Sequence, residues 1–163
     1  MFATAWSETY PWSMLDLDKI REQSGLTISP EGVFHHHGAP VENEKVQVLF
    51  SQGVRVREDG RVILRVGPQW CYVAADDTPY VILGLSGLQT EQPQMRLNTG
   101  VKEVLDPSTL WVSEDDVLYA RVNGGVLARF SRNAFHQLIT DFWSAIARGC
   151  NYIKNTIWHA SFF

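Results

Sequence analysis

The sequence predicts an α+β fold in which two related hairpin-plus-helix repeats are joined by an antiparallel β-meander. The first observation is a spacing. The interval from Leu26 to Phe50 equals the interval from Leu118 to Phe142, and each reads as strand, glycine-containing turn, strand and helix. The second observation is the pair Asp59-Gly60 between the alternating segments VRVRE and RVILRV, which is a strong hairpin signal. Two similar units imply two lobes with a cleft between them.

The first lobe is predicted over residues 26–90, after an N-terminal segment of residues 1–25. In that segment Ser13 is placed to cap a short helix over residues 14–24, and Gly25 is placed to end it. The first hairpin spans residues 26–37 and turns at Pro30-Glu31-Gly32. A helix then begins near Pro40 or Val41 and ends at Gly53, with Val46, Leu49 and Phe50 on one side. The meander follows, through VRVRE, RVILRV, QWCYVAA and YVILGL.

The second lobe is predicted over residues 91–163, and residues 86–94 (SGLQTEQPQ) are the most loop-like stretch between the two. Short strands are expected near 95–98 and 101–105, and the second hairpin over 117–130. Ser131 is placed to cap the most amphipathic helix of the chain. Gly149 ends that helix, and TIWHASFF reads as a last strand. We expect both lobes to form one compact unit.

Composition and charge favour an ordinary soluble protein. Of 163 residues, 45% are hydrophobic and 20% are charged, which is typical of a globular domain. The net charge of −4 and the scattered basic residues lack the basic face that nucleic acids require. No apolar run approaches the roughly 20 residues that span a bilayer, and the first residues do not resemble a secretory signal. Cys71 and Cys150 have no CxxC spacing and read as reduced thiols. We therefore predict a cytoplasmic protein that binds neither nucleic acid nor membrane.

Ordered motifs over roughly residues 26–163 resemble the bacterial domain-of-unknown-function family 1285. As that family is known, it carries a Gly-x-Pro-Ile start, a Leu-Phe helix, an Asp-Gly hairpin and an Asp-Ala-Pro-Phe element. The matching segments here, at the same spacing, are Gly38-x-Pro40-Val41, Leu49-Phe50, Glu58-Asp59-Gly60-Arg61 and Asp77-Thr78-Pro79-Tyr80. Weaker echoes follow at Thr99, Val101, Glu103, Val104, Gly125, Ala128, Ser131-Arg132 and Leu138. The resemblance implies a fold of repeated α+β motifs without an established activity, and ligand sensing or signal transduction is the conjecture for such proteins.

The chain departs from that family pattern at polar positions. Asn43, Asn98 and Asn123 stand where arginines are expected. The segment Val66-Gly67-Pro68-Gln69 replaces Thr-Pro-Val-Glu, and Gly100 and Lys102 replace an Asn and an Asp. A polar cleft shared by the family would therefore be rebuilt or lost in this chain.

The run His35-His36-His37 is the one pattern that suggests a metal. In a strand, His35 and His37 alternate onto one face, as paired imidazole ligands do. A metal site needs a third and usually a fourth ligand, and neither His136, His159 nor the pair Asp76-Asp77 has diagnostic spacing. The alternative interpretation is a partly exposed strand whose histidines are solvated. No P-loop, Gly-x-Gly-x-x-Gly or nucleophile motif is present, so we predict no cofactor.

The leading hypothesis is a non-enzymatic binding module for a small molecule or protein partner, with a regulatory role. The alternative is a metal-assisted hydrolase that uses His35 and His37. Acidic clusters such as Glu114-Asp115-Asp116 and Asp76-Asp77 read as turns, less clearly so for Asp77. The polar residues expected to face the cleft are His35, His37, Asp77, Asn98, Arg121 and Arg132. Trp6 and Trp12 lie in a polar segment whose aromatics must pack on the body or on a second copy, for which a homodimer is the default.

Overall fold

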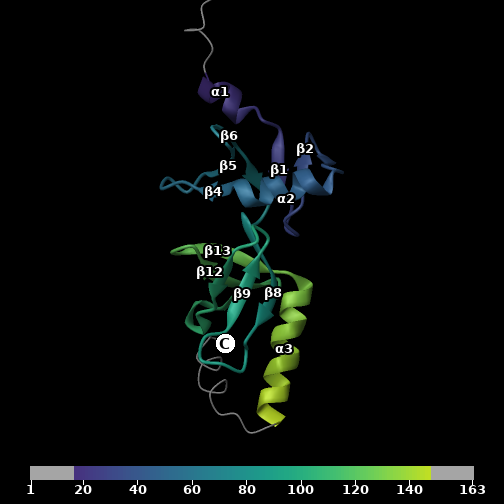
Figure 1. Ribbon diagram of the computed structural model, residues 1–163, viewed down its shortest axis with the longest axis vertical. Helices are drawn as coiled ribbons and strands as arrows, with labels where there is room; N and C mark the ends of the chain where they lie inside the picture. Colours follow the sequence, from purple (N-terminus) through teal and green to yellow (C-terminus); the bar gives the residue numbers. More distant parts are fainter. Residues whose placement is uncertain (1–16, 148–163) are drawn as a thin grey trace, which may run out of the picture.

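The protein, described by a computed structural model over residues 17–147, folds as two groups of elements that follow one another along the chain (Figure 1). The first group comprises α1 (Leu17–Glu22), β1 (Leu26–Ile28), β2 (Phe34–His36), β3 (Ala39–Pro40), α2 (Glu44–Gly53), β4 (Val54–Val56), β5 (Val62–Val66), β6 (Gln69–Tyr72) and β7 (Ala74–Ala75). The second group comprises β8 (Tyr80–Ser86), β9 (Gln94–Leu97), β10 (Lys102–Val104), the 3-10 helix η2 (Pro107–Thr109), β11 (Trp111–Val112), β12 (Leu118–Val122), β13 (Val126–Phe130) and α3 (Arg132–Ala147). The predicted α+β class is confirmed.

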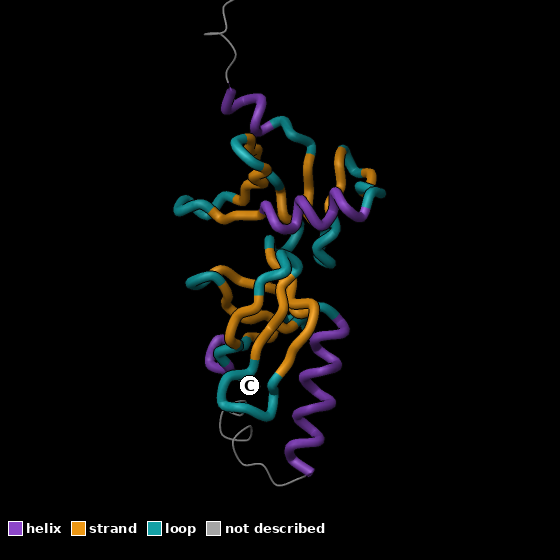
Figure 2. The backbone as a smooth tube through the Cα atoms, in the orientation of Figure 1, coloured by secondary structure: helices purple, strands orange, loops and turns teal. Residues whose placement is uncertain are grey.

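The described strands form separate sheets in each group. The first group holds a sheet of order β3-β2-β1-β7 and a three-stranded sheet β4-β5-β6. The second group holds one sheet of order β10-β9-β8-β13-β12-β11, and Figure 2 shows α3 running beside its strands. Only β1 with β7 and β13 with β8 pair in parallel among these strands. Of the predicted antiparallel meander, only β4-β5-β6 forms one. The segments expected to continue it do not, because β7 pairs in parallel with β1 and β8 pairs in parallel with β13 in another sheet.

The two hairpin-plus-helix units share their order of elements but differ in their sheet neighbours. In each unit an antiparallel hairpin, β1-β2 or β12-β13, precedes a helix. In the first unit the first strand of the hairpin, β1, has the parallel neighbour, whereas in the second unit the second strand, β13, has it. Phe50 is half-buried, and the side chain of Phe142 lies outside the described residues. The equivalence of the two units therefore stays a prediction.

The Asp59-Gly60 hairpin forms with a different turn from the one its sequence suggests. A type I′ turn needs positive φ at both central residues, and only Gly60 has it, at +81°. The amide of Gly60 donates to the carbonyl of Arg57 at 2.9 Å, and the amide of Arg57 donates to the carbonyl of Arg61 at 2.9 Å. This is the three-residue loop in which a type I turn is followed by a left-handed glycine. The Asp59 side chain accepts from the amide of Arg61 at 3.0 Å, which favours the longer turn.

Helix α2 begins four residues later than Pro40, the earlier of the two predicted starts. Ala39 and Pro40 pair with β2 as a short edge strand. A proline lacks the amide donor that a central strand needs, and an edge position tolerates this loss. Asn43 is the N-cap, since its Oδ1 accepts from the amides of Lys45 and Val46 at 3.0 and 3.3 Å. The position at which the family pattern has an arginine is thus used here to start a helix.

The core of the described chain is continuous across both groups. It contains Ile28, Phe34, Val54 and Leu64 from the first group and Ile82, Met95, Ala128 and Phe130 from the second. Phe34 is fully buried and meets the ring of Phe50 edge-on, with ring centroids 5.3 Å apart. Gln47 of α2 fixes this contact, because its amide oxygen accepts from the Phe34 amide at 2.9 Å and its nitrogen donates to the Phe34 carbonyl at 3.0 Å. Leu49, expected on the same face, is 46% exposed.

The loop over residues 87–93 joins β8 to β9 inside the six-stranded sheet. The chain passes from the first group to the second at residues 76–79. A division into domains at residue 90 stays a prediction, and the sheet that contains β8 favours residues 76–79 instead.

Ser131 caps α3 as predicted, since its Oγ accepts from the Ala134 amide at 3.2 Å. Ala134 and Leu138 are buried, whereas Phe135 and Ile139 of the same predicted stripe are partly exposed. The predictions for Ser13, for the N-terminal tryptophans Trp6 and Trp12, for Cys150 and for the last strand lie outside the described residues.

The burial of Phe34 gives a first prediction. Phe34→Ala should lower the free energy of unfolding by about 3–5 kcal/mol, because it leaves a cavity against Phe50. Phe135→Ala, on a ring that is 38% exposed, is the matched control and should cost about 1 kcal/mol. Urea denaturation followed by circular dichroism measures both. Equal costs would show that Phe34 is not the centre of the core.

Candidate functional site

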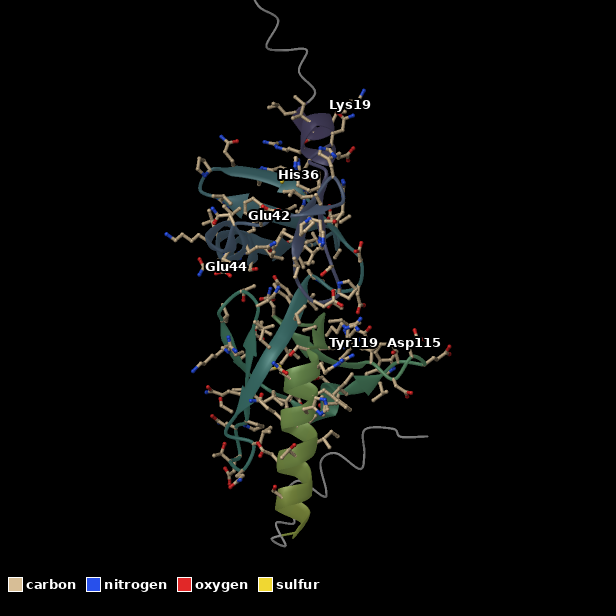
Figure 3. The ribbon with its side chains drawn as sticks, turned by 90° about the vertical axis from the view of Figure 1, so that its right-hand side faces the viewer. Lys19, His36, Glu42, Glu44, Asp115 and Tyr119 are labelled. Atoms are coloured by element: carbon tan, nitrogen blue, oxygen red, sulfur yellow. The ribbon has the colours of Figure 1, made fainter. Side chains whose placement is uncertain are left out.

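A polar cluster lies where the chain passes from the first group to the second. Oδ2 of Asp77 accepts from Nη1 of Arg129 at 2.8 Å and from the hydroxyl of Tyr119 at 2.9 Å. Tyr119 and Arg129 stand directly opposite each other on β12 and β13, so the hairpin aims both side chains at one carboxylate. Thr78 reinforces the contact, because its hydroxyl oxygen accepts from the Arg129 amide at 3.2 Å. Figure 3 shows Tyr119 near the level where the two groups meet, with Asp115 farther out on the same hairpin.

Contacts within this cluster raise the pKa values of Arg129 and Tyr119. The hydrogen bond that Arg129 donates to Asp77 raises the pKa of Arg129, and the negative charge of Asp77 adds to the effect. Burial raises the pKa of the Tyr119 hydroxyl, and the hydrogen bond to Asp77 raises it further. Arg129 therefore stays charged and Tyr119 stays neutral near pH 7. Groups that already satisfy one another in this way position the two halves of the chain and are poor acids or bases.

The turn of the first hairpin reaches the same cluster from the other side. A Cβ atom on Gly32 would lie 3.1 Å from Cγ2 of Val81 and 3.3 Å from Nδ2 of Asn98, so only glycine fits there without displacement. Oδ1 of Asn98 accepts from the Val81 amide at 3.0 Å, while its Nδ2 is buried without a hydrogen-bond partner among the described residues. The hydroxyl of Ser29 lowers the pKa of Glu31, and the charges of Arg129 and His35 add smaller contributions. We call Glu31, Asp77, Asn98, Tyr119 and Arg129 the junction cluster.

The six residues predicted to face a cleft are only partly brought together. Asp77 and Asn98 belong to the junction cluster, and His35 lies beside it. The other three lie elsewhere: Arg121 donates to the Gly125 carbonyl of its own turn at 2.7 Å, Arg132 is exposed at the start of α3, and His37 lines a separate depression.

The predicted pairing of His35 with His37 on one strand face is wrong. Strand β2 ends at His36, and His37 takes a left-handed conformation with φ of 49°, which turns its ring away from the strand alternation. That ring packs on Gly25, where a Cβ atom would collide with it, and the His37 amide donates to the Gly25 carbonyl at 2.8 Å. Within residues 17–147, no three His, Cys, Asp or Glu side chains gather as a metal ion would need.

The candidate functional site is an open depression of about 490 Å³ at the α1 end of the molecule. Its polar lining comes from Glu22, Ser24, Thr27, His37 and Arg61, and its apolar lining from Leu26, Val62, Tyr72, Val73 and Ala74, with Gly25 and Gly38 completing the wall. Strands β1, β5, β6 and β7 thus supply one side and the end of α1 the other.

Arg61 is the central polar group of this depression. Its guanidinium lies 3.4 Å from the ring centroid of Tyr72, a stacking that fixes the plane of the cation. Nη2 of Arg61 donates to Oε1 of Glu22 at 3.1 Å. The hydroxyl of Ser24 donates to the Tyr72 carbonyl at 2.6 Å, so the proton of this serine is held by the backbone.

Helix α1 is held over the depression by a second stack. Arg21 lies 4.1 Å from the ring centroid of Trp70 and pairs with Asp18 at 3.1 Å. Trp70 and Tyr72 meet edge-on on β6, with centroids 5.3 Å apart. Two consecutive residues of α1, Arg21 and Glu22, therefore attach it to the sheet through an aromatic face and through Arg61. Both contacts are at the surface, where such interactions are individually weak.

Sequence reasoning missed Arg129, Tyr119, Arg61 and Glu22. For the first two a signal existed: counting outward from the Asn123-Gly124-Gly125 turn pairs Tyr119 with Arg129 on one face. No local pattern links Glu22 with Arg61, because they lie on different elements. Cys71 is half-buried and packs against the hydrophobic core, and burial raises the pKa of its thiol.

The described chain is thus an α+β protein of two parts. Each sheet is formed by strands of one part, and the junction cluster connects the two parts. None of the helices within residues 17–147 has the length and apolar character needed to cross a membrane. No family model matches the sequence, and no curated protein matches it.

Solved structures of the DUF1285 family share this fold. A DUF1285 family protein from Silicibacter pomeroyi DSS-3 superposes with a TM-score of 0.57 at 20% identity, covering 71% of this chain and 68% of that one. A second, from Shewanella baltica OS155, superposes with a TM-score of 0.57 at 15% identity, covering 72% of this chain and 92% of that one. The resemblance predicted from the ordered motifs is thereby confirmed at the level of the fold.

The junction cluster gives a second prediction. Asp77→Asn should lower the free energy of unfolding by about 1–2 kcal/mol, because Arg129 loses its charged partner at a site only partly open to water. The neighbouring Asp76→Asn, at an exposed side chain, should change it by about 0.5 kcal/mol or less. Chemical denaturation of both variants provides the comparison. If the two substitutions cost the same, Asp77 does not hold the junction.

A third prediction concerns Glu31 and pH. Its pKa in the folded protein lies below its ordinary value, so it contributes stability above the unfolded pKa that is lost as pH falls through the folded pKa. Ser29→Ala should move the pKa of Glu31 back up toward the ordinary value, because Ser29 is the largest cause of the shift. NMR titration of the Glu31 carboxyl measures this. Ser108→Ala, which should act on Asp106 instead, is the control, and an unmoved Glu31 in Ser29→Ala would refute the assignment.

Proposed function

We propose that this chain is a non-enzymatic cytoplasmic binding module whose small-molecule site is the depression between α1 and strands β1, β5, β6 and β7. The order of the sequence motifs and the likeness of fold support its placement as a divergent member of the DUF1285 family. A regulatory role fits such a module because occupancy of the site is coupled to the position of α1. Whether a second copy of the chain is a partner stays a prediction.

One observation carries the proposal. The depression, at about 490 Å³, falls within the roughly 300–1,000 Å³ typical of ligand sites. It combines an apolar lining with a few convergent polar groups, which is the composition that such sites share. The junction cluster, in contrast, has its main charges already paired.

The chemistry of the depression favours binding over catalysis. Ser24 and His37 both line it, but the Ser24 hydroxyl donates to a backbone carbonyl. A nucleophilic serine requires a base that accepts this same proton. The arrangement therefore supports a site that holds a ligand, and the hydrolase alternative lacks the gathered metal ligands that it needs among the described residues.

The regulatory role rests on Glu22. This residue is both a lining group and the last residue of α1. A ligand that engages Arg61 also meets Glu22, so binding alters the Arg61–Glu22 contact, which together with Arg21 on Trp70 attaches α1 to the sheet. Binding in the depression thus changes how firmly α1 is held.

A thermal-shift screen of metabolites tests this function. A ligand present at 100 times its Kd adds about 2.7 kcal/mol of apparent stability, so a true ligand should raise the melting temperature of the wild type measurably. The shift should disappear in Arg61→Gln and persist in Arg65→Gln, an exposed arginine of β5 that lies outside the depression, four residues after Arg61. A shift that survives Arg61→Gln would place the site elsewhere, and a screen without any shift would argue against a small-molecule site.

A further inference from the structure

We infer that the depression is built for a small zwitterion of the α-amino-acid type with an apolar side chain, its carboxylate on Arg61 and its ammonium group on Glu22. This inference rests on the proposed function and names its ligand class. It follows from the charges, the exposure and the lining of the site.

Arg61 has donors to spare and a fixed orientation. A guanidinium has five N–H donors, and Glu22 accepts from one of them. Stacking on the Tyr72 ring at 3.4 Å holds the plane of the cation, so its remaining edge is presented in a defined direction. A planar fork of this kind matches the two oxygens of a carboxylate.

Glu22 supplies the opposite charge in the same depression. Only Oε1 of Glu22 accepts from Arg61, so among the described residues the second oxygen is left for another donor. The two side chains of the pair are 46% and 52% exposed, and ion pairs in such surroundings contribute little. A ligand can therefore replace the pair at small cost.

The balance of charges selects between ligand classes. A simple anion on Arg61 would face the carboxylate of Glu22, and a simple cation on Glu22 would face the guanidinium. A zwitterion placed between them gives each charge an opposite partner and leaves the net charge of the site unchanged. The structure thus favours a ligand with both charges on adjacent atoms.

The remaining lining sets the side chain of that ligand. Leu26, Val62, Val73 and Ala74 border the depression. Val73 belongs to the hydrophobic core, and Leu26 and Val62 pack against it. Aliphatic surface of this kind favours an apolar side chain, because burying it removes hydrocarbon from water. Leucine is the natural first probe.

Isothermal titration calorimetry of the full chain with matched ligands tests the inference. L-Leucine carries both charges, L-leucinamide lacks the carboxylate and isocaproate lacks the ammonium group. We expect leucine to bind and each analogue to bind about tenfold or more weakly, since each loses one charge-assisted contact. The other apolar amino acids, titrated in the same way, show which side chain fits best.

Glu22→Gln gives a result that unfolding cannot imitate. This substitution should lower the affinity for leucine, because the partner of its ammonium group loses its charge. It should raise the affinity for isocaproate relative to the wild type, because the carboxylate that repels a simple anion is gone. Arg61→Gln should abolish binding of both, and Arg65→Gln should change neither. Circular dichroism melting of each variant confirms that it is folded.

The outcomes separate this inference from the proposed function. If no apolar amino acid binds but another metabolite gives a shift that depends on Arg61, the ligand class is wrong and the proposed function stands. Equal affinity for leucine and leucinamide, or no gain for isocaproate in Glu22→Gln, would also overturn the zwitterion. If no compound shifts the wild type, both proposals fail.

Discussion

The ion pair between Asp77 and Arg129 is the constraint on which the arrangement of this protein depends. Asp77 sits in the four residues that lead from the first group of elements to the second, and Arg129 lies on the strand that pairs with β8 directly after that passage. One carboxylate thus fixes the connecting segment to the hairpin β12-β13. The turn at Gly32 closes on the same region, and the continuous core fills the space behind it.

The two polar regions of the molecule differ in how completely their charged groups are paired. In the junction cluster, the Asp77 carboxylate accepts hydrogen bonds from Tyr119 and Arg129, and the charges of Asp77 and Arg129 are paired with each other. In the depression, Arg61 and Glu22 meet through a single exposed contact, and stacking on Tyr72 orients the cation without using its donors. Charged groups that are fully paired favour a structural role, whereas charged groups that are held in a fixed orientation and keep unused hydrogen-bond donors or acceptors favour binding. This difference decides which region we assign to a ligand.

Local signals in the sequence were sufficient for most elements and insufficient for the site. The hairpins at Pro30–Gly32 and Asn123–Gly125, the antiparallel strands β4-β5-β6 and the cap at Ser131 all follow from turn chemistry and alternation, which act over a few residues. The segment YVILGL does not join that meander, because its pairing with β13 is a long-range contact. The predicted helix start at Pro40 is too early, because the pairing of Pro40 with β2 is a tertiary contact. The predicted shared face of His35 and His37 fails, because β2 ends one residue before His37. Arg61 and Glu22 are 39 residues apart, and a local pattern in the sequence does not predict a contact over that separation.

The assignment of sheets to contiguous stretches of chain bears on the order in which the protein is made. Every described strand before residue 76 pairs only with another strand before residue 76. Every described strand after residue 79 pairs only with another strand after residue 79. As the chain leaves the ribosome from its N-terminus, the first two sheets can complete their hydrogen bonds without waiting for later sequence. Arg129 then emerges about fifty residues after Asp77. The contact that joins the halves is therefore among the last to form, after the first half has acquired its own shape.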